Sequence, residues 1–301
     1  MTKIEYRLVA FIDILGFKNL VLNNVESILD ILSSFQSEAS RISHFESHIM
    51  EQLNTNELTE EQKNGALSDL KRQDMQISMF SDLFVISYSN YRNNLGYSII
   101  ELFDKIRDMQ NELSSFNVFL RGGITYGKLY HKGKICFGEA MIKAYKIEST
   151  VAVYPRIIID SEIYNKKFFQ QLFEFSSCKI EYFEDNQFGI SIFNSAKRVL
   201  QTEKIVEILK VENPLMKENG DYSYKFLFFI EMEKLKKVIE VNVKWYFDQS
   251  KNDERTREKI KWMVLTYNQI LNMQVEYIDE KYYKDLYKKL ILDKESNLLT
   301  S

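Results

Sequence analysis

Residues 11–17 read FIDILGF, and the expected fold is built outward from this stretch. From Leu8 to Ile14 the chain is apolar except for one acid, Asp13, which is the pattern of a strand buried inside a sheet. Burying a lone carboxylate is unfavourable unless a counter-charge or a metal ion accompanies it. Asp13 is therefore a candidate functional residue.

A second acid interrupts apolar sequence at residues 79–84, MFSDLF, where Asp82 joins two short expected strands. If Asp13 and Asp82 meet at neighbouring strand positions, they supply the oxygen ligands that Mg²⁺ requires. Two divalent cations there would activate a hydroxyl and neutralise a triphosphate, which would make both acids catalytic. The alternative is that Asp82 is only a turn residue, as aspartate often is. The pair, taken with the glycine motifs below, favours the functional interpretation.

Gly16 follows the first acid at the expected passage from strand to helix. Such a turn presents backbone N–H groups and the positive end of a helix dipole to an anion. We therefore expect the N–H groups of Leu15, Gly16 and Phe17 to bind phosphate.

Further along, strand-like and helix-like spacing alternates in the order β-α-(α)-ββ-α-β-α-β. This order predicts an α+β fold, a ferredoxin-like sandwich of helices on an antiparallel sheet, with a catalytic domain at 1–165 and a mainly helical extension at 166–301. The expected strands are 8–14, 76–80, 83–88, 117–126, 135–137 and 156–159, with another strand or hairpin at 180–193. The expected helices are 18–53, 97–113, 138–150, 202–211, 231–245 and 254–273, and 54–71 is a helical or loop insertion.

The composition excludes several classes of protein. The 301 residues have a formal net charge of −3, so the total charge does not indicate a nucleic-acid partner. Two cysteines, Cys136 and Cys178, form no disulfide framework and suit a reducing compartment. The N-terminus lacks a signal-like apolar stretch, and the longest apolar runs are too short to span a bilayer. We expect a cytoplasmic protein with no membrane partner.

Four short motifs, in order over about residues 5–160, resemble the class III nucleotide cyclases. FIDILGF is similar to the first metal motif of that family, and Ser81-Asp82 to its second metal position, where Gly-Asp is usual. Residues 121–127, RGGITYG, resemble the family's Gly-Ile-x-x-Gly hairpin, and residues 138–148, GEAMIKAYKIE, its transition-state helix. The resemblance implies two Mg²⁺ or Mn²⁺ ions held by Asp13 and Asp82, with the Ile14 carbonyl as a further ligand.

Departures from the family pattern argue against an ordinary adenylate cyclase. Ile142 stands where the family usually has asparagine, and Lys146 where it has the transition-state arginine. Lysine neutralises phosphate as a point charge but lacks the bidentate fork. Ser78 and Ile135 occupy the two positions that select a purine, so the groups that read adenine are absent.

One branch of the family fits these departures: the chain resembles the pyrimidine cyclases of bacterial anti-phage signalling, the Pycsar cyclases. They share the Asp-Ile-Leu-Gly-Phe start, a Phe-Ser-Asp second site and an Arg-Gly-Gly-Ile strand, and residues 154–157, YPRI, are also similar. The resemblance implies that UTP, or alternatively CTP, becomes a 3′,5′-cyclic monophosphate and pyrophosphate. It also implies that infection triggers synthesis and that the product activates a separate membrane or TIR-domain effector.

The resemblance implies further site residues. In a head-to-tail homodimer, Lys146 of one subunit would stabilise the transition state in the other; a solvated helix residue is the alternative. Arg121 and Arg156 would bind phosphates, or serve as structural ion-pair partners. Tyr145 and Ser78 would line the base pocket, or be a packed ring and a strand-surface hydroxyl.

Three other functions remain open. A palm-type polymerase or diguanylate-type enzyme shares the sandwich and two acids, although residues 80–82, FSD, do not match Gly-Gly-Asp/Glu-Glu-Phe. A non-catalytic nucleotide sensor tolerates the changes at 142 and 146, but a simple binding protein has less need of buried acids. An interaction protein would use a C-terminal apolar stripe, although most such stripes are core. The stripe is Ile260, Met263, Val264 and Tyr267.

Overall fold

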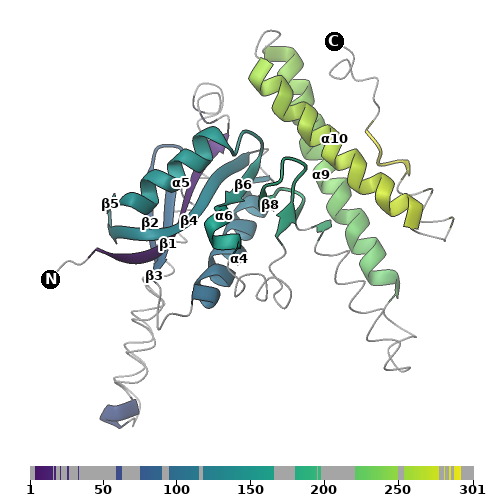
Figure 1. The fold of residues 1–301 in the computed structure, drawn as a ribbon. Helices are drawn as coiled ribbons and strands as arrows, with labels where there is room; N and C mark the ends of the chain where they lie inside the picture. Colours follow the sequence, from purple (N-terminus) through teal and green to yellow (C-terminus); the bar gives the residue numbers. More distant parts are fainter. Residues whose placement is uncertain are drawn as a thin grey trace.

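The computed structural model shows an α+β chain in which helices cover a curved sheet and two long helices lie beside it (Figure 1). The structure describes residues 4–15, 17, 21, 26, 33, 59–62, 75–89, 95–114, 118–165, 180–194, 196–197, 221–249, 254–277, 281, 285 and 288–292. The helices with both ends among the described residues are α4 (Leu95–Ser114), α5 (Glu139–Thr150), α6 (Ser161–Tyr164), α9 (Asp221–Gln249) and α10 (Glu254–Tyr277).

One mixed sheet contains the described strands in the order β2-β3-β1-β4-β6-β8-β7, and β5 pairs with the end of β4. Neighbouring strands are antiparallel except β4 and β6, which are parallel. The strands are β1 (Glu5–Leu15), β2 (Met75–Phe80), β3 (Leu83–Ser89), β4 (Phe119–Lys132), β5 (Ile135–Phe137), β6 (Arg156–Ile159), β7 (Glu181–Tyr182) and β8 (Phe188–Ser191).

Alternate side chains of β1 enter two hydrophobic clusters, because successive side chains of a strand point to opposite faces. The even-numbered side chains from Leu8 to Ile14 pack with α4. Val9 and Phe11 instead pack with the buried alanines of α5. Asp13 has the parity of Val9 and Phe11, so it lies on the face of the sheet that α5 covers.

The two C-terminal helices pack on the same end of the sheet. A hydrophobic cluster joins α9 and α10 to Phe119 of β4, and Leu15 packs against it. The Trp262 ring of α10 stacks on the Tyr154 ring, with centroids 5.2 Å apart and an angle of 8° between planes. α10 therefore lies near the end of β1 that contains Asp13. In the part of the chain that the structure describes, no helix is both long and apolar enough to cross a bilayer.

The α+β class is confirmed, and the sheet, expected to be antiparallel, is mixed. β4 and β6 are parallel because the chain returns through α5 and so repeats its direction. The expected hairpin at 180–193 is present as β7 and β8, which join the sheet from beyond the predicted boundary at residue 165.

Some of the other expected elements are present in the structure, and others lie outside the described residues. The strands at 135–137 and 156–159 have the expected bounds, and α9 and α10 contain the helices expected at 231–245 and 254–273. The helices expected at 18–53 and 202–211 and the insertion at 54–71 lie largely or wholly outside the described residues.

Candidate active site

Asp13 and Asp82 lie next to each other where β1 meets the turn between β2 and β3. Asp13 pairs with Leu83 in the β1–β3 register, and the Ile14 N–H donates to the Asp82 carbonyl oxygen at 2.9 Å. The backbone bonds on either side of that hydrogen bond limit the distance between the Cα atoms of Asp13 and Asp82 to about 8.5 Å. Asp13 is buried and Asp82 is half-buried. The structure thus brings the two candidate acids together.

The residue before Asp82 has a backbone conformation that is unusual for its type. Ser81 has a φ of 60°, in the left-handed region. This region costs a residue with a Cβ about 1–2 kcal/mol, whereas glycine adopts it without strain. The class III cyclases usually have glycine at this position. Strained residues of this kind concentrate at functional sites, because the surrounding structure must enforce them.

Arg121 lies directly across from Asp13 on β4 and contacts two carboxylates. The β1–β4 register pairs Asp13 with Arg121, and the Arg121 Nε–H donates to Asp13 Oδ2 at 2.7 Å. The Arg121 Nη2 atom lies 2.7 Å from Oε1 of Glu148 on α5. Arg121 was expected to bind phosphate or to form a structural ion pair, and here it bridges Asp13 and Glu148.

Glu148 is a buried acid that the sequence reasoning missed. Ala140, Ala144 and Glu148 follow one another at intervals of four, which puts them on the buried face of α5. An acid in phase with two buried alanines is a signal that could have identified it. Its Oε1 atom has no aligned hydrogen-bond partner among the described residues, so the contact with Arg121 is mainly electrostatic.

Burial raises the pKa of the Glu148 carboxyl above its ordinary value. The positive charge of Arg121 lowers this pKa, the negative charge of Asp13 raises it, Lys259 on α10 lowers it, and Asp82 raises it. The charges of all four side chains thus influence the pKa of Glu148. The site is therefore one electrostatic unit built from β1, the β2–β3 turn, β4, α5 and α10.

Glu148→Gln is expected to keep or raise the free energy of unfolding at neutral pH. The raised pKa means that the folded state favours the neutral carboxyl. That stabilising contribution is complete below the unfolded pKa and disappears as the pH rises through the folded pKa. The glutamine variant should therefore gain on the wild type as the pH rises from acid to neutral. Urea unfolding at several pH values measures this, and a loss that grows toward neutral pH would show that Arg121 outweighs burial.

The donors at this site suit a hard divalent cation. Two acidic residues are backbone neighbours here, and the Ile14 carbonyl points to the same side of β1 as its N–H, toward Asp82. Oxygen-only donors fit Mg²⁺ or Mn²⁺. A cation at Asp13 would compete with Arg121 for the carboxylate. Within the described ranges, no group of three or more acidic, histidine or cysteine side chains is already assembled for a metal.

The expected phosphate-binding turn is described only at its two ends. Leu15 ends β1 and is half-buried, and Phe17 is helical and packs against the cluster under α4. Gly16 lies outside the described residues. That the N–H groups of Leu15, Gly16 and Phe17 bind phosphate therefore stays a prediction.

Ser78 and Arg156 have other partners in the folded chain, and their expected contact with substrate stays a prediction. The Ser78 hydroxyl donates to the Gly133 carbonyl at 2.7 Å and lies 2.7 Å from His131 Nε2. Arg156 pairs with Asp185 and is only 2% exposed. Both side chains are buried among structural partners, so the structural alternative fits each of them better.

Tyr145 and Lys146 lie on the outer part of α5. The Tyr145 ring meets the Phe11 ring edge-on, with centroids 5.4 Å apart, yet it remains 54% exposed. Lys146 is exposed, roughly opposite the buried Ala144 and Glu148. The structure therefore does not direct Lys146 toward Asp82 or Asp13 of its own chain.

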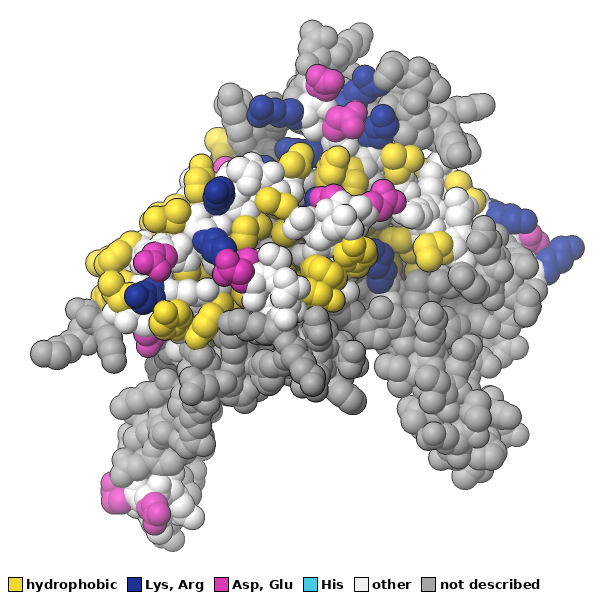
Figure 2. Space-filling model, viewed as in Figure 1, with side chains coloured by type: hydrophobic (Ala, Val, Ile, Leu, Met, Phe, Trp, Pro, Cys, Tyr) yellow, Lys and Arg dark blue, Asp and Glu magenta, His cyan; other side chains and the backbone are white. Residues whose placement is uncertain are grey.

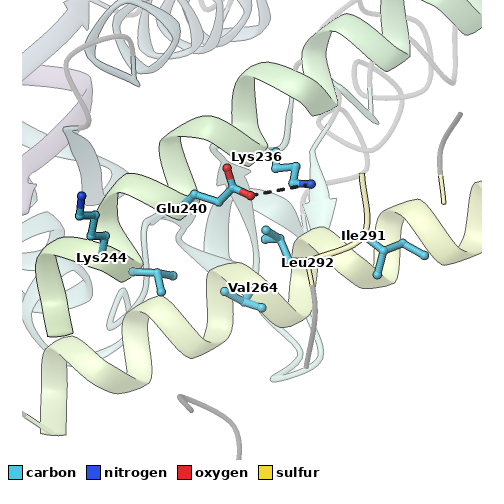
Figure 3. A pocket seen from close by; sticks show the side chains of 7 residues that line it. Lys236, Glu240, Lys244, Val264, Ile291 and Leu292 are labelled. Atoms are coloured by element: carbon cyan, nitrogen blue, oxygen red, sulfur yellow. Dashed lines mark ion pairs between the residues drawn. The ribbon is translucent and has the colours of Figure 1, made fainter. Parts of the chain in front are cut away.

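A cavity of about 310 Å³ lies outside this site, between α9, α10 and residues 291–292. Figure 3 shows Lys236, Glu240 and Lys244 along α9 at its rim, opposite aliphatic side chains that include Val264. The Lys236 Nζ atom lies 3.8 Å from the Glu240 carboxylate and donates to the Lys289 carbonyl. None of the candidate active-site residues lines this cavity.

Comparison with known proteins does not identify a family for the chain. No protein-family model matches the chain, and no curated protein matches it. The resemblance to the class III cyclases thus rests on the four sequence motifs, and the family remains a proposal.

Proposed function

We propose that the chain is a class III nucleotide cyclase that converts UTP, or alternatively CTP, to the 3′,5′-cyclic monophosphate and pyrophosphate. The single observation that carries the proposal is the adjacency of Asp13 and Asp82, which reach one end of the sheet from separate segments. Adjacent acids in an environment that shifts the pKa of a neighbouring group are typical of reactive sites. The predominantly antiparallel sheet, covered by α4 and α5, is compatible with the cyclase sandwich.

The reaction requires the ribose 3′-OH to attack the α-phosphorus in line with the departing pyrophosphate. Asp13, Asp82 and the Ile14 carbonyl would hold two Mg²⁺ or Mn²⁺ ions, which lower the pKa of the hydroxyl and neutralise the leaving oxygens. Arg121, lying beside Asp13, offers a planar fork to phosphate oxygens. The backbone N–H groups near Leu15 bind the remaining phosphate oxygens in this scheme.

A homodimer belongs to this proposal because Lys146 faces away from the acids of its own chain. A neighbouring exposed apolar surface supports it: Ile142 and Tyr145 of α5 and Ile135 and Phe137 of β5 are each more than half exposed. Figure 2 shows hydrophobic side chains gathered over the α5 and β5 side of the molecule. A second copy seated there would bury this surface and present Lys146 to the other active site.

Ile142→Glu is expected to convert the dimer to a monomer, because it places a charge at the centre of an apolar contact. Product formation should fall at least about tenfold, since each active site loses the partner's Lys146. Light scattering measures the mass, and Leu265→Glu is the matched control because Leu265 is an exposed apolar residue on α10. An unchanged mass for Ile142→Glu would rule out this face as the interface.

The reaction is tested by incubating the full-length chain with each of the four nucleoside triphosphates and Mn²⁺. Mass spectrometry of the products should find a cyclic mononucleotide from UTP or CTP. Linked nucleotides would instead indicate a polymerase-like enzyme, and a purine cyclic product would identify another nucleotide cyclase. Recovery of every triphosphate intact would contradict the enzyme proposal.

A non-catalytic nucleotide sensor is the second candidate, and the Asp13–Arg121 ion pair favours it. An acid already neutralised by a guanidinium has less need of a metal ion. A sensor would bind UTP or CTP, detected by calorimetry, and leave it intact in the presence of Mn²⁺.

The remaining parts of the proposal concern the cell. We propose a cytoplasmic enzyme in anti-phage defence, whose cyclic product activates a separate effector and which needs neither a nucleic-acid nor a membrane partner. Loss of phage protection in an Asp13→Ala strain, measured beside the wild-type gene and its effector, tests this role.

A further inference from the structure

Arg121 contacts two acids from different elements, and this arrangement exceeds what burial of Asp13 requires. One guanidinium at 2.7 Å from Asp13 Oδ2 already neutralises that carboxylate. Glu148 nevertheless places a second carboxylate oxygen 2.7 Å from another nitrogen of the same guanidinium, Nη2. The Glu148 side chain is 4% exposed, so its charge is poorly solvated and unfavourable to bury. A buried acid that weakens its own fold invites a functional explanation.

The position of Glu148 is fixed by the close packing of α5 on the sheet. α5 packs so closely on β4 that a Cβ at Gly123 would lie 2.4 Å from the Ala144 carbonyl oxygen. Ala144 is one helical turn before Glu148, so the helix that carries the carboxylate has no room to approach the sheet further. Arg121 thus has one partner that is anchored on a packed helix and another, Asp13, at the end of a strand.

Charge decides what happens when Asp13 takes another partner. Asp13, Asp82 and Glu148 outnumber the single Arg121, and Lys259 only partly offsets the difference. A cation at Asp13 is therefore attracted by the cluster, but it also repels Arg121. Without Glu148, the guanidinium would have no described carboxylate to hold it once Asp13 is engaged.

Resting on the proposed function, we propose that Glu148 is a positioning residue that keeps Arg121 in the site when Asp13 binds a divalent cation. Arg121 exchanges its contact with Asp13 for the phosphate oxygens of the nucleoside triphosphate, while its Nη2 atom stays on Glu148. Glu148 also adds negative charge that favours the cation. It touches neither the substrate nor the reacting atoms, so its effect passes through Arg121.

The test uses Glu148→Gln, Glu148→Asp and a matched control, Glu181→Gln, in the full-length chain. Glu181 is also a buried acid on the sheet, where it accepts hydrogen bonds from Ser191 and pairs with Lys197, away from Asp13. Circular dichroism and thermal unfolding first establish that each variant is folded. Electron paramagnetic resonance then measures Mn²⁺ binding without nucleotide, and steady-state kinetics separates kcat from KM.

Glu148→Gln is expected to weaken Mn²⁺ binding about tenfold, because it removes a nearby negative charge and leaves Asp13 as the only charged partner of Arg121 among the described residues. It should lower kcat by about 10–100-fold with a smaller change in KM, the effect of a displaced guanidinium. Glu148→Asp keeps the charge but retracts it, so Mn²⁺ binding should stay within about twofold of wild type while kcat falls about tenfold. This second variant serves if the glutamine variant does not fold.

Two outcomes distinguish failure of the positioning role from failure of the proposed function. If the wild type forms the cyclic product while both Glu148 variants match Glu181→Gln in Mn²⁺ affinity and kcat, the positioning role is wrong and the proposed function stands. If the wild type forms no cyclic product, the proposed function fails, and a Glu148→Gln chain that binds Mn²⁺ as the wild type does overturns the positioning role as well.

Discussion

Asp13→Asn is expected to lower cyclic-nucleotide formation by at least about a thousandfold while the chain stays folded. Asparagine keeps the shape and one oxygen of the side chain but loses the negative charge that a divalent cation needs. Metal-borne stabilisation of the transition state amounts to several kcal/mol, and each 1.36 kcal/mol is tenfold in rate, so about a thousandfold is the lower bound. The fold should survive because Arg121 retains Glu148 and the Ile14–Asp82 backbone bond is untouched. Mass spectrometry of the product at saturating Mn²⁺ measures the loss.

Asp160→Asn is the matched control for this experiment. Asp160 is also a buried aspartate after a strand, and it accepts a hydrogen bond from Thr125 at 2.6 Å and pairs with Lys143 at 2.7 Å. Its substitution should lower thermal stability, since it weakens the hydrogen bond and the ion pair of a buried carboxylate, and leave product formation within about threefold of wild type. If Asp13→Asn keeps more than about a tenth of the activity, the cation does not bind at Asp13 and the two-metal scheme is wrong.

The sequence was sufficient to find the acids because local pattern alone identifies them. An acid that interrupts an apolar run calls for a counter-charge or a metal ion, and the structure buries both the run and Asp13. Two short strands flanking a two-residue turn likewise predict the β2–β3 hairpin that carries Asp82, whereas the pairing of β1 with β3 that sets it beside Asp13 is seen only in the structure. Local periodicity likewise gave β5 and β6 their bounds. Each of these inferences used residues close together in the chain.

The parts that the sequence did not reveal depend on contacts between distant residues. Glu148 becomes meaningful only when α5 lies across β4 and brings it to Arg121. Long-range contacts also determine the parallel pairing of β4 with β6 and the addition of β7 and β8 to the sheet. The spacing of apolar residues does not predict these pairings. The apolar pattern of a strand indicates which of its side chains are buried, but it does not indicate which strand pairs with it.

Ser78 and Arg156 illustrate the same limit from the opposite direction. Each was a candidate because its chemistry and its place in the resemblance suited a nucleotide. Their partners, His131 and Asp185, lie 53 and 29 residues further along the chain, and they hold both side chains in structural contacts. A polar residue on a strand can serve either role, and only the folded neighbours decide between them.

Gly123→Ala is expected to lower the free energy of unfolding by about 3 kcal/mol, near the upper end for an overpacked interior. The new methyl group would lie 2.4 Å from the Ala144 carbonyl oxygen and 2.7 Å from the Ile147 Cβ atom. The first of these is backbone, so the clash is relieved only if α5 moves away from β4. Because that movement also carries Glu148 away from Arg121, product formation should fall more steeply than the folded fraction. Urea unfolding and activity at matched folded concentration measure the two effects.

Gly127→Ala separates this clash from the general effect of replacing a glycine in β4. Gly127 lies four residues further along the same strand and also faces α5, but a Cβ there would meet the Ala140 Cβ atom at 3.4 Å, an ordinary contact. Alanine also lowers the conformational entropy of the unfolded chain, so this variant should match the wild type or exceed it by about 0.4–1 kcal/mol. Equal losses of stability in the two variants would mean that strand propensity, rather than the distance between α5 and β4, controls the result. Loss confined to Gly123→Ala would instead locate the constraint where the helix approaches the sheet most closely, one helical turn before Glu148.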